Sequence, residues 1–386
     1  MAEAARMGMG DVVRHFEGLE DPRSNVNLRH PLESVVVIAV LGVLAGADGP
    51  TSIVEWAQTR KDLLLSALDL PHGIPKKDVF RRVLSGLQPQ AFQSCFAAWI
   101  NALRTQALAR EGIEQLTFAI DGKSLRRSHN RRDGLGALHS VSVWASQLGL
   151  SLGEVACDGK SNEITAIPLV LQLVDIRGAI VTIDAMGTQT AIAAQIVDAK
   201  GDYVLALKGN QETTHDSVVD YINQQAESDF QNIGARRHET HEKGHGRLET
   251  RTVIQMPVPK DLPGVDRWRG LNTIAVVMLS CIRDGKETVE TRYYLSSLEM
   301  GVRRIADAIR SHWAIENTLH WCLDVTYRED ESRIREKNLR SNFAWLRRFT
   351  LSLLKQHPGK TSIAMKRRKC GWSDEFLFEV INAVKT

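Results

Sequence analysis

The chain has 386 residues, of which 43% are hydrophobic and 25% charged, and its net charge is only +3. This is an ordinary globular composition, which excludes collagen-like, low-complexity and disordered proteins, and the length predicts more than one structural unit. The total charge excludes a protein that coats nucleic acid by charge alone. Residues 301–370, however, hold 16 Lys or Arg against 7 Asp or Glu, so one end of the molecule is basic and suited to a polyanion.

The five cysteines are widely spaced and form no CxxC pair, which predicts reduced thiols and no zinc finger. The longest apolar run, residues 35–47, is shorter than the roughly 20 residues that cross a bilayer. We therefore expect a soluble, cytoplasmic protein that has no membrane partner.

The N-terminal part, from residue 31 to about residue 110, has the period of amphipathic helices interrupted by Gly- and Pro-containing turns. The helix predicted at residues 76–85 places Arg81 and Arg82 on its outer face. Two interpretations stay open here: a helix-turn-helix recognition helix, or an amphipathic helix with a solvated basic face.

From residue 116 the pattern changes to strands, and the predicted order is β-β-β-α-β-α-β. That order indicates a mixed sheet, begun by an antiparallel meander and continued by crossover helices, and it is also the order of the RNase H-like fold. Residues 236–298 alternate or are β-branched, which predicts a β-rich insertion, and helical periodicity returns at residue 301.

Two aspartates end apolar strands in this prediction. Asp121 follows LTFAI and Asp184 follows AIVTI, so adjacent parallel strands would bring both to one rim of the sheet. The helix from residue 301 can add Glu316, which shares a face with His312 and His320 at i, i+4 and i+8. Carboxylates suit Mg²⁺, and two such ions can support an in-line phosphoryl displacement.

Other interpretations compete with this one. Asp121-Gly122 is also a good turn dipeptide, and Asp324 and the acidic run 329–331 are rival sources of a third carboxylate. Zinc is disfavoured, because the two helical histidines come with neither an HExxH motif nor a cysteine partner.

Several motifs in chain order resemble the H-repeat-associated (ISAs-type) insertion-sequence transposases, which are bacterial DDE enzymes. They are DGK at Asp121, KSNEITAIPLVLQLV from Lys160, IDAMGTQ at Asp184, LALKGNQ from Leu205, GHGRLETR from Gly244 and IRSHWAIENTLHWCLDVTYRED from Ile309. The resemblance implies a catalytic triad of Asp121, Asp184 and Glu316 that binds two Mg²⁺ or Mn²⁺ ions. It implies nicking at the ends of the element and attack of the freed 3′-hydroxyl on target DNA.

The resemblance and the predicted elements together define an α/β chain with an RNase H-like mixed-sheet core. The expected parts are a helical N-terminal domain that binds DNA ends (1–110), the core in two segments (111–230 and 301–345), a β-strand insertion (231–300) and a basic helical C-terminal region (346–386).

DNA contacts are expected from basic and polar side chains near the rim, on the insertion and in the tail. They are Lys123, Arg126, Arg127, Lys208, Asn210, Gln211, His245, Arg247, Arg251, His312, Arg367 and Arg368. A solvated basic loop is the alternative for the arginines that follow Asp121, and Trp268 either packs in the insertion or stacks on an unpaired base. The resemblance also implies a DNA-dependent homodimer that acts at the nucleoid of a bacterial cytoplasm.

One motif that is common in the wider group of related transposases is missing. Its Tyr, Arg and Lys positions around the glutamate are occupied here by Ile309, His312 and Leu323, so a DNA hairpin intermediate is not implied. Two other functions stay open: a sequence-specific DNA-binding protein on the same fold that performs no chemistry, and a metal-dependent nuclease without strand transfer.

Overall fold

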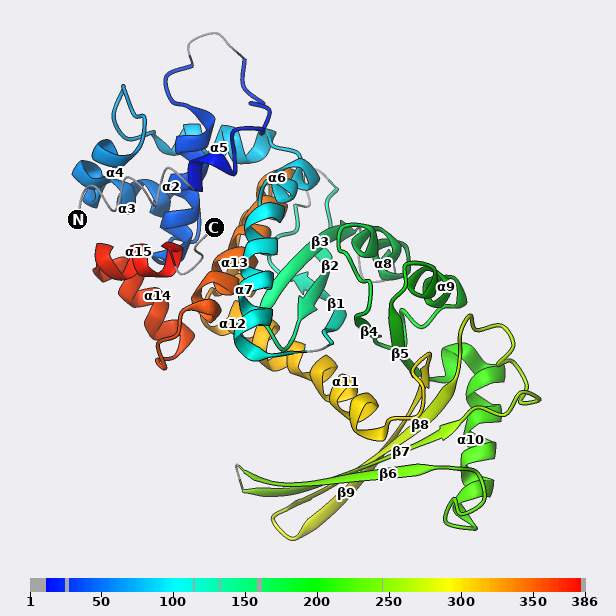
Figure 1. Ribbon diagram of the computed structural model, residues 1–386. Helices are drawn as coiled ribbons and strands as arrows, with labels where there is room; N and C mark the ends of the chain where they lie inside the picture. The colour runs from blue at the N-terminus through cyan, green and yellow to red at the C-terminus, as the bar shows by residue number, and fades with distance from the viewer. Residues whose placement is uncertain are drawn as a thin grey trace.

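The structure, a computed structural model, describes residues 12–24, 28–113, 115–130, 132, 134–157, 162–244 and 246–382. Its centre is one nine-stranded mixed sheet with the order β3-β2-β1-β4-β5-β9-β8-β7-β6. Helices cover both faces of its first part, and a helical body lies beside β3 (Figure 1). Over the described ranges, every helix is too short or too polar to cross a bilayer.

The first five strands have the connectivity that the sequence predicts. They are β1 (Thr117–Leu125), β2 (Leu138–Ala145), β3 (Leu150–Cys157), β4 (Ile180–Ile183) and β5 (Asp202–Leu207). β1, β2 and β3 pair antiparallel, whereas β1, β4 and β5 pair parallel. β4 is buried along its whole length, as expected for a central strand covered on both faces.

The predicted β-rich insertion forms four long strands that continue this same sheet. They are β6 (Arg236–Gly244), β7 (Arg247–Pro257), β8 (Thr273–Arg283) and β9 (Lys286–Ser296). β9 pairs antiparallel with β5, from Val204↔Ser296 to Leu207↔Tyr293, so the insertion is hydrogen-bonded to the core. The two hairpins extend away from the body of the molecule, and β6 is the edge strand (Figure 1).

Different helices cover the two faces of the sheet. α8 (Glu163–Gln172) and α9 (Thr190–Asp198) connect the parallel strands, and α10 (Glu212–Ala226) follows β5. α11 (Val302–Ile315) covers the other face, where Ile305 and Ile309 belong to one buried cluster with Ile180, Val204 and Tyr294. α11 therefore spans the junction between the core strands and the insertion.

The helical body combines both ends of the chain. Its helices are α2 (Leu32–Leu44), α3 (Pro50–Thr59), α4 (Lys61–Ala67), α5 (Lys77–Gly86), α6 (Pro89–Cys95), α7 (Ala97–Glu111), α13 (Lys337–Gln356), α14 (Ile363–Trp372) and α15 (Asp374–Asn382). α13 runs between the N-terminal helices and the sheet (Figure 1), and the expected boundary after residue 345 falls inside it. α5 buries Phe80 and exposes Arg81 and Arg82, which fits either interpretation of this helix.

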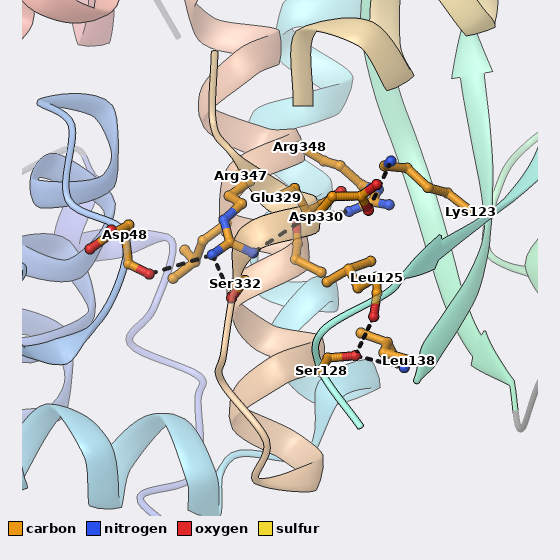
Figure 2. A network of polar contacts seen from close by, with 12 residues as sticks. Asp48, Lys123, Leu125, Ser128, Leu138, Glu329, Asp330, Ser332, Arg347 and Arg348 are labelled. Atoms are coloured by element: carbon orange, nitrogen blue, oxygen red, sulfur yellow. Dashed lines mark hydrogen bonds and ion pairs between the residues drawn. The ribbon is translucent and has the colours of Figure 1, made fainter. Parts of the chain in front are cut away.

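A buried ion network fixes α13 against the sheet (Figure 2). The Arg348 guanidinium donates to Glu329 at 3.0 Å and lies 3.4 Å from Glu154 of β3, and all three side chains are at least 95% buried. Arg347 lies 3.8 Å from the same Glu329 oxygen and donates to the hydroxyl of Ser332. Glu329 belongs to the short turn that follows the Glu316 helix, so the network joins that turn, α13 and the sheet.

The network is electrically balanced, with two guanidinium groups and two carboxylates. Burial opposes the charge on Arg348, but Glu154 and Glu329 raise its pKa above the ordinary value. Burial raises the pKa of Glu154 despite the nearby Arg348. Arg347 and Arg348, which the sequence adds to the basic C-terminal end, are therefore interior residues.

Replacing Arg348 by Met should lower the free energy of unfolding by about 3–5 kcal/mol, because two carboxylates would stay buried without their main partner. Urea unfolding followed by circular dichroism measures this change. The control is Arg368→Met on the exposed side of α14, which should change stability by less than about 0.5 kcal/mol. Equal effects of the two substitutions would contradict the role of the network.

Candidate active site

The two aspartates lie side by side across the β1–β4 pair. The last parallel partners are Ile120 and Ile183, and Asp121 and Asp184 are each the next residue along. The prediction that Asp121 ends its strand is wrong, because β1 continues to Leu125, paired with β2. Asp121-Gly122 is thus not a turn. The aspartate projects from the point where β1 leaves β4 and pairs on one side only.

Gly122 is explained by the residues packed against it. A Cβ at this position would collide with the carboxylate of Glu163 and the ring of His139. Those two groups are themselves 2.6 Å apart, and both are buried. A second contact of 2.6 Å joins the other ring nitrogen of His139 to Ser124. The absence of a side chain therefore lets α8 and β2 pack closely behind Asp121.

The third carboxylate lies in a π-turn that directly follows α11. Glu316 begins a π-turn, Glu316–His320, in which the Trp321 N–H donates to the Glu316 carbonyl. Such one-turn π segments occur frequently at functional sites. Asp121, Asp184 and Glu316 all line one cavity of about 300 Å³, closed on the insertion side by residues of β9. The structure therefore brings the three acids predicted from the sequence to one place.

Two histidines lie next to the acids of this site. The Nδ1 atom of His320 lies 3.6 Å from Asp121 and 3.9 Å from Glu316. His312 lines the cavity, with its Nδ1 atom 3.1 Å from the hydroxyl of Thr182. Burial lowers the pKa of His312 to about 4, although Asp184 and Glu316 favour its charged form, so this ring is neutral at pH 7.

The carboxylates differ in their affinity for protons. Burial raises the pKa of Asp121 to about 6 against the opposing effects of His320 and the Gly122 N–H, and Glu316 and Asp184 add like-charge repulsion. The nearby His320 lowers the pKa of Glu316, which is half-exposed. The Oδ1 atom of Asp184 accepts hydrogen bonds from the N–H groups of Met186 and Gly187.

These groups are suitable ligands for a divalent cation. One donor atom each from Asp121, Glu316 and His320 fall within 4.8 Å of one another. A buried carboxylate with a raised pKa, next to two further acids, gains most from a cation, which offsets both burial and repulsion. Carboxylate oxygens are the donors that Mg²⁺ and Mn²⁺ prefer.

The rival acids are used elsewhere. Lys123 is buried and lies 2.6 Å from Asp324 and 3.8 Å from Asp330, so it joins β1 to the helix that follows the π-turn. Glu329 belongs to the network around Arg348. Lys123, predicted as a DNA contact, thus holds the helix that follows Glu316 against β1.

The other predicted DNA contacts lie in several environments. Arg126 and Arg127 are exposed beyond β1, and Arg126 lies 3.5 Å from Asp330. Lys208 is exposed at the cavity, whereas the side chains of Asn210 and Gln211 donate to the carbonyls of Ala185 and Thr188.

On the insertion, Arg247 pairs with Glu249 at 2.7 Å, and Arg251 approaches the same carboxylate at 4.0 Å. His245 lies outside the described residues. Trp268 is buried and its indole N–H donates to Thr214, which confirms the packing interpretation.

The two arginines of the tail lie in different environments. Arg367 donates to the carbonyls of Val43, Ala47 and Thr326 and stacks over the Tyr327 ring at 4.2 Å. Arg368 is exposed. The structure therefore leaves Arg367 half-buried, where it joins α14 to α2, and Arg368 at the surface.

Sequence reasoning missed two features of the site. The guanidinium of Arg292, on β9, stacks on the ring of Trp313 at 3.8 Å and lines the cavity. No sequence signal links these distant residues. His320 was predicted to share the Glu316 face, but its contact with Asp121 depends on the tertiary fold.

Comparison with known proteins identifies the class. The chain matches the family described as Transposase DDE domain over residues 113–354 and the family described as DDE_Tnp_1-associated over residues 13–100. It therefore belongs to the DDE transposase family, and the resemblance seen in the sequence motifs is confirmed.

The relatives support the same assignment. The chain is 35% identical to "Putative transposase YncI" of Escherichia coli O157:H7, covering 97% of this chain and 95% of that protein. It is 33% identical to "H repeat-associated putative transposase YhhI" of Escherichia coli K12, covering 97% and 98%. A solved piggyBac transposase synaptic complex with hairpin DNA covers 97% of this chain and 78% of the solved one at 10% identity, with a TM-score of 0.40 that is too low to bear on the fold.

Replacing Asp121 by Asn should raise the free energy of unfolding at pH 8, in buffer containing EDTA, by about 2–3 kcal/mol. The pKa of this carboxyl is higher in the folded protein than in the unfolded chain, so the native protein loses stability as the pH rises through about 6. The gain should fall to about half at pH 5. Urea unfolding at both pH values measures it.

The control is Asp198→Asn at an exposed position of α9, which should change stability by less than about 0.5 kcal/mol. A destabilised Asp121→Asn protein at pH 8 would show that the carboxylate is not under electrostatic strain.

Proposed function

We propose that the chain is an active DNA transposase that nicks the ends of its insertion element and transfers the freed 3′-hydroxyl to target DNA. The observation that supports this most strongly is the meeting of Asp121, Asp184 and Glu316 in one cavity of a chain from the DDE transposase family. The three acids come from two strands and a helix that are distant along the sequence, so their meeting depends on the whole fold.

In this proposal Asp121, Asp184 and Glu316 hold two divalent ions, Mg²⁺ or Mn²⁺. When bound, such ions activate a water or hydroxyl and stabilise the leaving oxygen of a phosphodiester. The protein's own residues bind and orient. One carboxylate oxygen of Asp184 accepts hydrogen bonds from the N–H groups of Met186 and Gly187, so its other oxygen is available to bind an ion in the cavity. Lys123 holds the helix after Glu316 through Asp324.

Neighbouring residues fit a role in placing the DNA backbone. Lys208 extends into the cavity from the end of β5, and Arg126 and Arg127 are exposed beyond β1. Cations at these places would fix the position of phosphates relative to the carboxylates. Neutral His312 cannot form an ion pair at pH 7, so it would contribute only a hydrogen bond.

We further infer that strands β1–β5 and their helices form an RNase H-like core, because both the element order and the strand order β3-β2-β1-β4-β5 fit that fold. The helical body would bind the element ends, and two copies would assemble on paired ends in the bacterial cytoplasm. DNA with the protein's own terminal repeats is the expected partner.

Strand transfer can be tested with labelled duplexes taken from the DNA that flanks the chain's own gene, incubated with Mg²⁺ and a target plasmid. The native protein should cut at the element end and join it to the plasmid, and Asp184→Asn should lower both activities at least about a hundredfold. Asp198→Asn, an exposed acid outside the cavity, serves as the matched control.

The products separate the three functions. Cutting without joining would indicate a nuclease, and an electrophoretic shift without cutting would indicate a DNA-binding protein that performs no chemistry. Unchanged cutting by Asp184→Asn would overturn the triad.

DNA binding can be tested through its dependence on salt. Replacing Arg126 and Arg127 together by Ala should reduce the slope of log K against log salt by about 2, because two phosphate contacts are lost. Arg177→Ala, an exposed arginine before the start of β4 and thus at the opposite end of the strands, should leave the slope unchanged. Fluorescence anisotropy between 50 and 300 mM salt, about the range where such slopes are measured, tests this. An unchanged slope in the double variant would remove this loop from the interface.

A further inference from the structure

His320 is a polar side chain of the site that the proposed chemistry has not yet used. It is 7% exposed and lies at the end of the π-turn that begins with Glu316. Its Nδ1 atom faces the carboxylates of Asp121 and Glu316 at 3.6 and 3.9 Å. Both distances exceed the length of a hydrogen bond to a carboxylate, which is about 2.7–3.2 Å.

The other ring nitrogen is also unsatisfied. Nε2 of His320 is buried and has no hydrogen-bond partner among the described residues. A buried polar group without a partner costs about 1–3 kcal/mol, and a strong bond at the other ring nitrogen would offset this cost. Nδ1 is the atom that faces the carboxylates of Asp121 and Glu316. A cation between these three groups would bind Nδ1 and leave Nε2 as the protonated nitrogen of the ring.

We propose that His320 is a nitrogen ligand of the divalent ion held by Asp121 and Glu316, and that this site therefore prefers a first-row transition ion such as Mn²⁺ to Mg²⁺. The proposal rests on the proposed metal-dependent function and adds a residue to its binding site. Adjacent ligands of a six-coordinate ion lie about 3 Å apart, so the three donors, within 4.8 Å of one another, need to close by less than about 2 Å.

The donor set explains the preference. Mg²⁺ takes oxygen ligands and keeps several waters, whereas an imidazole nitrogen adds affinity along the series from Mn²⁺ to Cu²⁺. The site combines two carboxylates with one imidazole. Asp184 would hold the second ion with oxygen ligands, so the two ions of the proposed pair would not be equivalent.

The test uses the full-length protein loaded with Mn²⁺ and a readout that is independent of catalysis. Pulsed electron paramagnetic resonance should detect ¹⁴N coupling from a directly bound imidazole. The coupling should disappear in His320→Asn and persist in His312→Asn, whose ring faces Thr182. The dissociation constant for Mn²⁺ should rise at least about tenfold in His320→Asn, and that for Mg²⁺ less than about threefold.

The outcomes distinguish this inference from the proposed function. Mn²⁺ that binds the native protein without ¹⁴N coupling overturns the role of His320 and leaves the metal-dependent function standing. Coupling that is lost in His312→Asn and kept in His320→Asn overturns it as well. A native protein that binds neither Mn²⁺ nor Mg²⁺ overturns both proposals. The native spectrum needs no variant, so a His320→Asn protein that fails to fold does not remove the test.

Discussion

The buried contact of Arg348 with Glu329 and Glu154 is the interaction on which the arrangement of the site depends. After the helix that carries Glu316, the chain must return to the sheet through a short turn and enter α13. Arg348 joins the turn, the helix and strand β3 in one contact, away from water. Charges buried at such short distances accept few alternative positions. We infer that the network acts mainly by fixing where this segment docks, so that Glu316 meets the rim formed by β1 and β4.

Lys123 forms a second ion pair that joins the sheet to this segment, closer to the site. It projects from β1 two residues after Asp121 and meets Asp324 on the helix that follows the π-turn. Side chains two residues apart on a strand share a face, so Asp121 and Lys123 point to the same side of β1. The strand that positions one carboxylate thus also anchors the helix that carries another.

The elements were readable from the sequence because their patterns are local. Alternation and apolar runs predicted the strands and crossover helices of the core, and the motif order predicted the three acids of the cavity. The continuation of β1 beyond Asp121 was not predictable, because Gly122 and Lys123 suggest a loop unless their distant partners are known. Glu163 and His139 explain the glycine, and Asp324 explains the lysine.

The basic tail shows the same limit. Lys and Arg in sequence look like a surface for polyanions, yet Arg347 and Arg348 are buried, and the half-buried Arg367 donates to a carbonyl far away along the chain. The contact between His320 and Asp121 likewise joins residues about 200 positions apart. Sequence spacing placed His320 beside Glu316, and only the folded chain places it beside the aspartate.

The edge position of β6 has a consequence for solubility at high concentration. A long strand with unpaired backbone groups is a template on which another chain can add, and it invites fibrous association. β6 carries closely spaced side chains of both charges, among them Arg236, Arg237, Glu242 and Lys243, all exposed. An approaching strand would have to desolvate these charges. The charges on β6 therefore oppose the addition of a second chain to this edge of the sheet.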